Sequence, residues 1–377
     1  MATSYDVRHS QDAQLGIKHE ATFGTGLDVS GVDTQVYRRI PMAQVTKPTF
    51  SVFRESRLLS GRGSIKDAGD TLLVQKGGTV TMPFDFIATP ELMFQHLMMV
   101  GQDFTDDGSN VYTVEFDGSS NKVAIGGTVS SGLPHTVNLA YMPSASATAD
   151  GIRINGTMCS DLTIKGDYGD RGGAITCSGT YWSGHSYTTT GDAVAKSQVE
   201  QVFDGTWVDP DENVFFHMAD LKTKTLDVDG ASNNDMLIKS FELNIANNVK
   251  AIGGDGLGNP EMYVIPQFDI TGNLVIKQDA NFDLSGGTNV MQSFFDKTTL
   301  SLALKFGDNT VTSVGEMNIL AEIQLTGDPT EDASDSGMFW TCLLYTSPSP
   351  RDQRGCRMAA WAFKKKRGGG GGGGGGG

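Results

Sequence analysis

The feature of this sequence that most constrains its fold is an alternation of apolar and polar residues with a period of two. The longest example has an apolar residue at every second position: Met317, Ile319, Ala321, Ile323 and Leu325. Shorter examples lie at 162–164, 241–245 and 300–306. Because successive side chains of a β-strand point to opposite faces of a sheet, each segment presents one face to a core and the other to water. Turns rich in Gly, Asp and Asn separate these segments, so we expect a chain built mainly of strands.

Helix signals are few in this sequence. Thr89 supplies a hydroxyl cap, Pro90 fits a first helical turn, and Glu91 favours the positive end of the helix dipole. The apolar stretch LMFQHLMMV follows, and Gly101 ends it. A second, weaker helix is predicted at 289–297. The sequence therefore predicts a mainly β fold, a sandwich or barrel with one or two short flanking helices.

The order of predicted elements is similar in the two halves of the chain. The first half is predicted to contain strands at 49–53 and 80–86, a helix at 91–100 and a strand at 111–116. The second half repeats this order, with strands at 241–245 and 263–276, a helix at 290–296 and a strand at 300–306. This order predicts two tandem β modules, at 41–185 with a helix near 90–100 and at 236–330 with a helix near 290–297. An N-terminal arm at 1–40 and a linker or insertion at 186–235 complete the expected organisation. A chance echo between β-rich segments explains the same order equally well.

Residues 342–377 are set apart by their composition. They begin with CLLYTSPSPRD, which resembles the in-frame translation of a transposase adapter used in sequencing libraries, and end with KKKR and ten glycines. We interpret them as an artefactual tail and leave them out of the expected fold.

The charge balance limits the classes of partner. The full chain has 29 basic and 44 acidic residues and a net charge of −15 at pH 7. The tail holds seven of the basic residues and one of the acidic ones, so the net charge without it is −21. A strongly acidic protein is not attracted to nucleic acid or to anionic lipid. No apolar run approaches the roughly 18 residues of a membrane helix, and the first residues lack a secretory pattern, so we expect no membrane contact and synthesis in a cytoplasm.

Two cysteines, Cys159 and Cys177, lie outside the tail. A hairpin centred on Arg171 predicts Cys177 opposite Lys165, which leaves Cys159 about 20 Å away at the rise of a strand. A disulfide requires Cα atoms within about 7 Å of each other. We therefore expect two reduced, buried thiols.

No pattern in the sequence predicts a catalytic, cofactor-binding or metal-binding site. None of the six histidines lies at metal-ligand spacing from another, and neither Cys159 nor Cys177 has a C-x-x-C partner. His96 is expected on the first helix among apolar residues, with its ring hydrogen bonds satisfied. The sequence does not exclude a pair of catalytic carboxylates of the glycosidase type, and no residue is assigned to such a pair.

Three motifs are weak matches to known sites. DVDGASNND at 227–235 lacks the glycine and the closing Glu of a calcium loop, so it is interpreted as a polar turn. GGDGLG at 253–258 has the glycines of a phosphate cradle but no following helix, which favours a loop. Asn155-Gly156-Thr157 fits a glycosylation acceptor and is interpreted as a turn.

Several segments resemble the tail tube proteins of long-tailed bacteriophages. AQLGIKHEATFGTG at 13–26 is similar to the arm that precedes the β domain in that family. Residues 54–101 are similar to the glycine-rich loop, strand and helix of that family. Its central hairpin is similar to residues 155–184, NGTMCSDLTIKGDYGDRGGAITCSGTYWSG. Residues 237–279 and 322–329 are similar to its later strands. The resemblance covers most of residues 13–330, and the Ser/Thr-rich stretch near 186–200 has no counterpart.

The resemblance implies a virion structural protein of the tail and not an enzyme. Such subunits form rings that stack into a tube, and the tube conducts DNA from capsid to cell. The ring is expected to be a hexamer, or a trimer of two-module chains that imitates one. The implied partners are further copies of the chain and other tail proteins, with DNA passing through an acidic lumen without specific binding. Synthesis is expected in the host bacterial cytoplasm, and segments 13–33 and 60–70 are expected to be flexible and to fold on a neighbouring ring.

Two other classes stay open. In a glycan- or surface-binding β-sandwich, Tyr181, Trp182 and Trp207 would form a stacking platform, although aromatic residues in strands are more often part of a core. In a β-rich hydrolase, the unassigned carboxylate pair would carry the chemistry.

Overall fold

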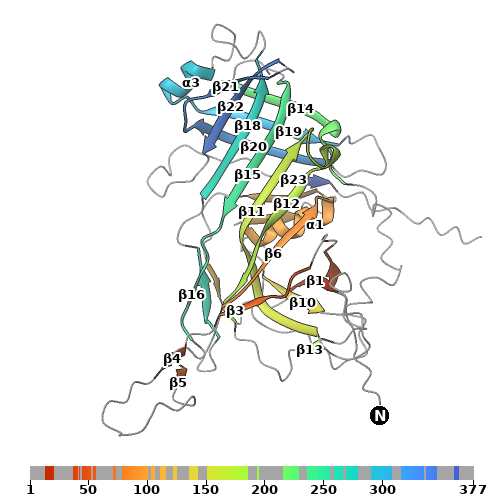
Figure 1. Ribbon diagram of the computed structural model, residues 1–377, viewed down its shortest axis with the longest axis vertical. Helices are drawn as coiled ribbons and strands as arrows, with labels where there is room; N and C mark the ends of the chain where they lie inside the picture. The colour runs from red at the N-terminus through yellow and green to blue at the C-terminus, as the bar shows by residue number, and fades with distance from the viewer. Residues whose placement is uncertain are drawn as a thin grey trace, which may run out of the picture.

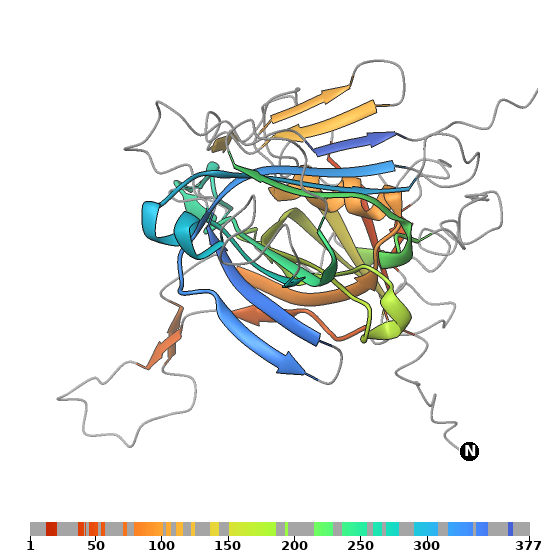
Figure 2. The same cartoon turned by 90° about the horizontal axis from the view of Figure 1, so that it is seen from above.

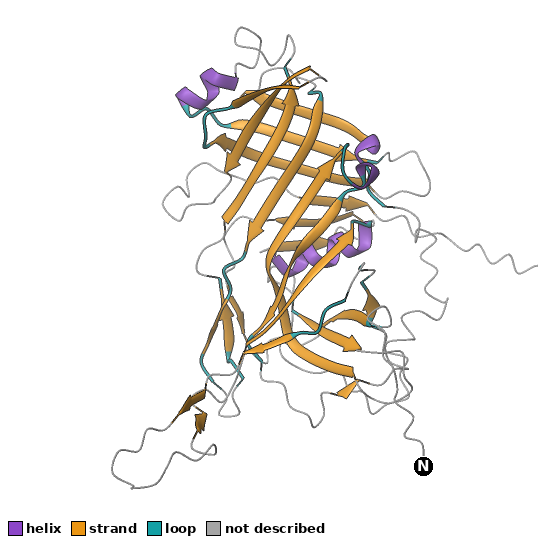
Figure 3. Cartoon of the chain, in the orientation of Figure 1, coloured by secondary structure: helices purple, strands orange, loops and turns teal. Residues whose placement is uncertain are grey.

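The computed structural model shows an antiparallel β protein with two short α-helices, which confirms the expected mainly β fold (Figures 1 and 3). It describes residues 13–20, 37–40, 42, 45–51, 54–56, 71–73, 79–100, 103–106, 111–115, 122–124, 136–142, 151–185, 193–194, 215–228, 236–254, 259–265, 269–278, 290–307, 316–334, 337–345 and 361–364.

A large sheet, called here the main sheet, forms the front layer in Figure 1. Its longest strand is β11, Gly151–Asp167, whose upper half pairs with β12 on one side and with β15 on the other. Its lower half pairs with β10 and β13. The order across the upper part is β3 (Thr49–Ser51), β6 (Thr79–Ile87), β12 (Thr176–Ser183), β11, β15 (Ile238–Ala246), β18 (Asp269–Lys277), β22 (Gly337–Tyr345) and β21 (Thr330–Ser334). The lower part adds β13 (Ala193–Val194), β10 (Val137–Met142), β1 (Gln14–His19) and β2 (Arg38–Arg39).

A second layer lies behind the main sheet, with its strands crossing those of the front layer (Figures 1 and 2). Its order is β14 (Leu221–Val228), β19 (Leu300–Phe306), β20 (Glu316–Leu325), β23 (Trp361–Lys364), β8 (Val111–Glu115) and β7 (Asp103–Asp106). Strand β20 also pairs with β22, so the two layers are joined along one border. The sandwich is therefore closed on that side.

Two small sheets complete the described strands. One contains β16 (Lys250–Ile252), β17 (Met262–Val264) and β9 (Lys122–Ala124). The other is the pair β4 (Arg54–Ser56) and β5 (Thr71–Leu73), which lies at the lower end of the molecule in Figure 1.

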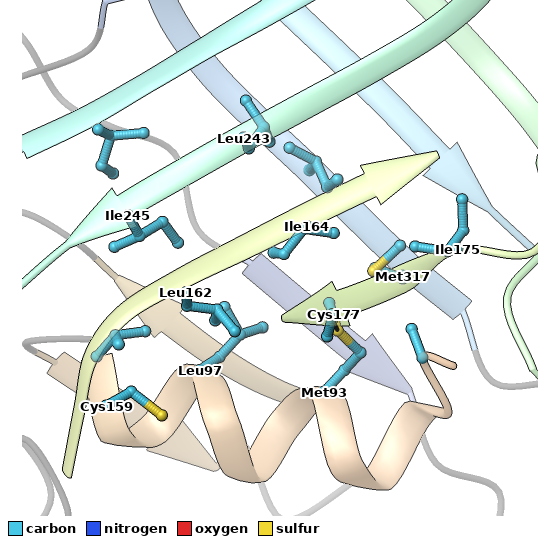
Figure 4. Close-up of a cluster of buried hydrophobic side chains, with 14 of the residues drawn as sticks. Met93, Leu97, Cys159, Leu162, Ile164, Ile175, Cys177, Leu243, Ile245 and Met317 are labelled. Atoms are coloured by element: carbon cyan, nitrogen blue, oxygen red, sulfur yellow. Dashed lines mark hydrogen bonds between the residues drawn. The ribbon is translucent and has the colours of Figure 1, made fainter. Parts of the chain in front are cut away.

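The core fills the space between the two layers, and α1 (Pro90–Val100) packs into it. Figure 4 shows Met93 and Leu97 of α1 below Leu162 of β11, with Met317 of β20 contributed by the second layer. The helix begins as predicted, because the backbone N–H of Leu92 donates a hydrogen bond to Thr89 Oγ1 over 3.4 Å. The second predicted helix is also present, as α3 (Val290–Asp296).

The described part of the N-terminal arm is not a free segment. Leu15 and Ile17 in β1 are buried, and the strand lies between β2 and β10. The expectation of flexibility is therefore wrong for residues 14–19, since their apolar side chains gain more by packing on the core than by staying in solvent. The rest of the segment expected to be flexible, residues 21–33, lies outside the described part, as does the segment 60–70.

The main sheet runs across both of the expected modules. Residues 161–167 of β11 pair with 240–246 of β15, so strands from the two halves of the chain are neighbours. Within the expected linker, residues 221–228 form β14 and belong to the second layer. The division into two duplicated modules stays a prediction.

The residues interpreted as an artefactual tail contribute to two strands. Cys342 and Leu344 are buried at the end of β22, and residues 361–364 form β23 beside β20 and β8. The prediction that residues 342–345 lie outside the fold is therefore wrong, because they continue the alternation of buried and exposed side chains along β22. Their origin in an adapter stays a prediction.

The hairpin of β11 and β12 differs by one residue from the predicted register. Cys177 lies opposite Ile164, and Lys165 lies opposite Thr176. The turn contains the 3-10 segment η2 (Arg171–Gly173), whose three residues all have positive φ angles of 45°, 68° and 93°. This geometry moves the centre of the turn ahead of Arg171 and shifts the pairing.

Candidate functional surface

One face of the main sheet carries polar side chains in cross-strand rows, and we call it the polar face. Along β11, polar Asp161, Thr163, Lys165 and Asp167 alternate with buried residues. Residues that pair across antiparallel strands lie on the same face, so the register fixes the composition of each row. Across β6, β12, β11, β15 and β18, the three central rows are Pro83–Thr180–Asp161–Ala246–Asp269, Asp85–Ser178–Thr163–Asn244–Thr271 and Ile87–Thr176–Lys165–Glu242–Asn273.

Side chains of the polar face hydrogen-bond to one another. Thr163 Oγ1 donates to Asn244 Oδ1 over 2.6 Å, and Asn244 Nδ2 donates to Glu242 Oε1 over 3.1 Å. At one border, both terminal nitrogens of Arg171 bind the Asp85 carboxylate, at 2.6 and 3.2 Å. These contacts hold the polar face in a defined arrangement on rigid strands.

The polar face is acidic. Its three central rows contain four carboxylates, Asp85, Asp161, Glu242 and Asp269, against one lysine, Lys165. Lys165 itself binds Asp170 over 3.1 Å, and that hydrogen bond lowers the pKa of the Asp170 carboxyl. The hydrogen bonds that the Arg171 guanidinium donates to the Asp85 carboxylate raise the pKa of Arg171. Each cation named here is thus neutralised by a neighbouring carboxylate.

His96 lies on the buried side of the main sheet, as the sequence predicts. Its Nδ1–H donates to the carbonyl oxygen of Leu92 over 2.6 Å, and its Nε2 accepts from the hydroxyl of Tyr181 over 2.5 Å. The rings of Phe84 and Phe86 lie 5.0 and 4.5 Å from the imidazole. Burial among these rings lowers the His96 pKa from 6.5 to about 4, so the ring is neutral near pH 7. This histidine is a satisfied core residue.

Cys159 and Cys177 are free thiols, as expected. Both Cys159 and Cys177 are buried and make no disulfide. Burial raises the pKa of each thiol well above its usual value, so neither forms a reactive thiolate at neutral pH. Figure 4 shows Cys177 directed at Met93 of α1.

The aromatic residues considered for a stacking platform do not form one in the described structure. Tyr181 is 1% exposed, packs 4.4 Å from Phe84 and uses its hydroxyl on His96. Trp182 lies on the polar side and packs edge-on against Tyr263 at 5.0 Å. Trp207 lies outside the described residues. Burial of Tyr181 removes its ring from any surface on which a sugar would stack.

A second polar cluster, which the sequence analysis missed, is buried where β1, β11 and β17 meet. The Glu20 carboxylate accepts hydrogen bonds from Thr136 Oγ1 over 2.6 Å and from the backbone N–H of Gly156 over 2.7 Å. The hydroxyl of Tyr263 donates to the carbonyl of Gly156 over 2.7 Å and accepts from the N–H of Gly184. Burial raises the pKa of Tyr263, which keeps its hydroxyl protonated. No local signal identifies such a cluster, because its members are far apart in the sequence.

The weak motifs of the sequence are accounted for in part. Asn155-Gly156-Thr157 is not a surface turn but part of β11, with Thr157 buried and Gly156 at a φ of 58°. In DVDGASNND, Asp227 and Val228 end β14, and the remaining residues lie outside the described part. In GGDGLG, only Gly253 and Gly254 are described, and both follow β16. The polar turn and the loop stay predictions.

The described residues form neither a metal site nor a membrane-spanning helix. No group of three or more His, Cys, Asp or Glu side chains in this part of the chain is arranged to hold a metal ion. None of the helices in the described segments has the length and apolar character needed to cross a bilayer.

Comparison with known proteins identifies the family. No curated protein matches the chain. A family model described as phage tail tube protein matches residues 10–338, which is most of the chain. This range contains all of the main sheet up to the start of β22, both helices and the polar face. The chain therefore belongs to the phage tail tube protein family.

Proposed function

We propose that copies of this chain form rings around a central channel, and that the polar face of the main sheet lines that channel. Family membership implies a place in the virion tail and assembly of the chain with itself and with other tail proteins. The proposal adds the ring, the DNA-conducting tube and the surface that faces the DNA. The role is structural, without a catalytic step.

The composition of the polar face is the observation that carries the proposal. Its rows combine hydroxyl and amide side chains with four carboxylates and one lysine, and the exposed apolar residues Ile87, Leu343 and Tyr345 lie at their ends. Proteins bind DNA mainly by placing Lys and Arg against phosphates, with release of counterions. A negatively charged surface repels phosphates over about 8–10 Å at physiological salt, so DNA slides past it without adhering.

Ring formation also accounts for the borders of the main sheet. The main sheet ends at β3 and β6 on one side and at β21 on the other, next to the place where β22 joins β20, and these two borders are unlike. Contact between unlike surfaces of identical subunits generates a closed ring when the rotation closes. A hexamer, or a trimer if the two-module division is real, satisfies this geometry. Covering sheet borders in this way also prevents uncontrolled edge pairing.

Electron microscopy of the purified chain tests the ring. We expect rings or tubes with a central channel, and a protein that stays monomeric at high concentration would contradict the proposal.

Charge reversal tests which face lines the channel. We expect tubes of the Asp161→Lys/Asp269→Lys variant to retain DNA at low salt, because both substitutions lie in one row of the polar face. The matched control, Glu261→Lys/Glu322→Lys, changes the net charge equally outside the polar face. Co-sedimentation of DNA with assembled tubes is the measurement. Equal retention by both variants would show that another surface faces the DNA.

A further inference from the structure

We infer that exposed apolar side chains at one end of the main sheet form the contact through which one ring stacks on the next. The inference rests on the proposed function, since it assumes that the polar face lines a channel. The contact, called here the strand-end rim, consists of Tyr168, Phe215, Leu237, Phe295 and Met338.

Three of these residues lie at neighbouring strand ends. The N–H of Tyr168, just after β11, donates to the carbonyl of Lys239 at the start of β15. The N–H of Lys277, at the end of β18, donates to the carbonyl of Leu237 over 2.7 Å. The N–H of Gln278 donates to the carbonyl of Met338 in β22 over 2.9 Å. Tyr168, Leu237 and Met338 therefore follow one another across β11, β15, β18 and β22.

The other two residues extend the rim behind the main sheet. Phe215 precedes the 3-10 segment η3 (Met218–Asp220), which is fixed to the β11–β12 turn because His217 Nε2 contacts the carbonyl of Gly172 over 2.5 Å. The Tyr168 hydroxyl also donates to the carbonyl of Met218, in η3. Phe295 belongs to α3, which lies at the same end of the molecule's long axis in Figure 1.

The exposure of this set is high for large apolar side chains. Phe295 is 67% exposed, Tyr168 and Leu237 are each 50% exposed, and Met338 and Phe215 are about 40% exposed. These five are half of the ten large apolar side chains that are exposed in the described part of the chain. Apolar side chains gathered in this way at one end of a molecule mark an interaction surface, because their contact with water is unfavourable.

The occupant is a second copy of this chain. Family membership implies self-assembly, and the two ends of the molecule differ, since the β4–β5 pair lies at the end opposite the rim (Figure 1). Contact between unlike ends is heterologous, and along the axis of a tube, where no rotation closes it, such contact extends an assembly without limit. In the proposed ring the lateral borders of the main sheet meet the neighbouring subunits, so its strand ends face the rings above and below. Because the strand-end rim lies at the strand ends, we assign it to the contact between one ring and the next.

Two exposed apolar residues provide a matched pair for the test. Leu237 in the rim is 50% exposed, and Ile252 in β16, away from the rim, is 49% exposed. We would compare the full chain with its Leu237→Ser, Phe295→Ser and Ile252→Ser variants. Thermal unfolding followed by circular dichroism checks that each variant folds, and negative-stain electron microscopy measures the length distribution of assemblies.

We expect Leu237→Ser and Phe295→Ser to give single rings or tubes at least several-fold shorter, while Ile252→Ser gives tubes of unchanged length. Rim variants with unchanged tubes would overturn the inference, and so would equal shortening by Ile252→Ser. Rim variants that fold but form no rings would assign the rim to lateral contact instead. Absence of both rings and tubes in the unsubstituted chain would count against the proposed function itself, which separates the two failures.

Discussion

The two faces of the main sheet use the same strands but are constrained to different degrees. On the buried face, Phe86, Cys177, Ile164 and Leu243 form a row that packs against α1 and the second layer. One residue along the strands, Asp85, Ser178, Thr163 and Asn244 form a row on the polar face. The first row is fixed by close packing, whereas the second is held by hydrogen bonds from Thr163 to Asn244 and from Arg171 to Asp85. The comparison teaches that the buried face determines the fold and leaves the polar face free to carry the function.

The largest expected difference between the faces lies at Gly179 in β12. A Cβ atom there would overlap the backbone oxygen of Asp161 and lie 2.8 Å from Phe84 Cζ. Because a backbone atom cannot rotate away, we expect Gly179→Val to prevent folding or to destabilise the chain by more than about 3 kcal/mol. Ser178→Val, one residue away on the polar face, should change the free energy of unfolding by less than about 1 kcal/mol. Urea denaturation of both variants is the measurement, and a folded Gly179→Val protein of normal stability would contradict the packing described here.

A neighbouring pair in β11 gives a smaller contrast. Ile164 is fully buried, so Ile164→Ala should lower the free energy of unfolding by about 2–5 kcal/mol. Thr163→Ala removes the hydrogen bond to Asn244 at the polar face, which should cost about 1 kcal/mol or less. Chemical denaturation under the same conditions compares the two. Equal losses would show that the polar face contributes to the fold as strongly as the core does.

The smallest expected effect is a pH dependence that originates on the buried face. The His96 pKa is about 4 in the folded chain and 6.5 when unfolded, so only the unfolded state binds a proton between these values. His96 therefore stabilises the fold fully above pH 6.5 and progressively less as the pH falls towards 4. We expect its contribution to be about 1.5 kcal/mol smaller at pH 5 than at pH 6.5.

A double variant isolates this contribution. His96→Met/Tyr181→Phe removes the titrating ring and the hydroxyl that would otherwise be buried without its partner. The free energy of unfolding, measured at pH 6.5 and at pH 5, should fall less in this variant than in the unsubstituted chain. The same fall in both proteins would mean that other groups account for the pH dependence.

Much of the local structure follows from short-range patterns. Alternation predicts β6, β15, β19 and β20, and a cap followed by proline predicts α1. The pairing register of β11 and β12 could not be predicted from the sequence, because it depends on three consecutive positive φ angles in the η2 turn. The arm was misjudged for a related reason, since Leu15 and Ile17 are buried only because β2 and β10 lie on either side of them.

The polar face was predicted in part. The sequence indicates that alternate residues of each strand face water, but it does not indicate which strands are neighbours. Asp161, in the first half of the chain, and Asp269, in the second, share a row only because β11, β15 and β18 are adjacent. The buried Glu20 has no sequence signal at all, since its partner Gly156 is 136 residues away.

The sequence by itself determined that this chain is a mainly β protein with two short helices, whose strands each have one apolar and one polar side. It did so because the direction of a side chain along a strand depends only on its position in the alternation. The tertiary structure alone decided which strands pair, which polar residues gather on one acidic face, and which apolar residues remain exposed at its end. Those outcomes depend on contacts between residues distant in sequence, and such contacts are selected by the packing of the whole core.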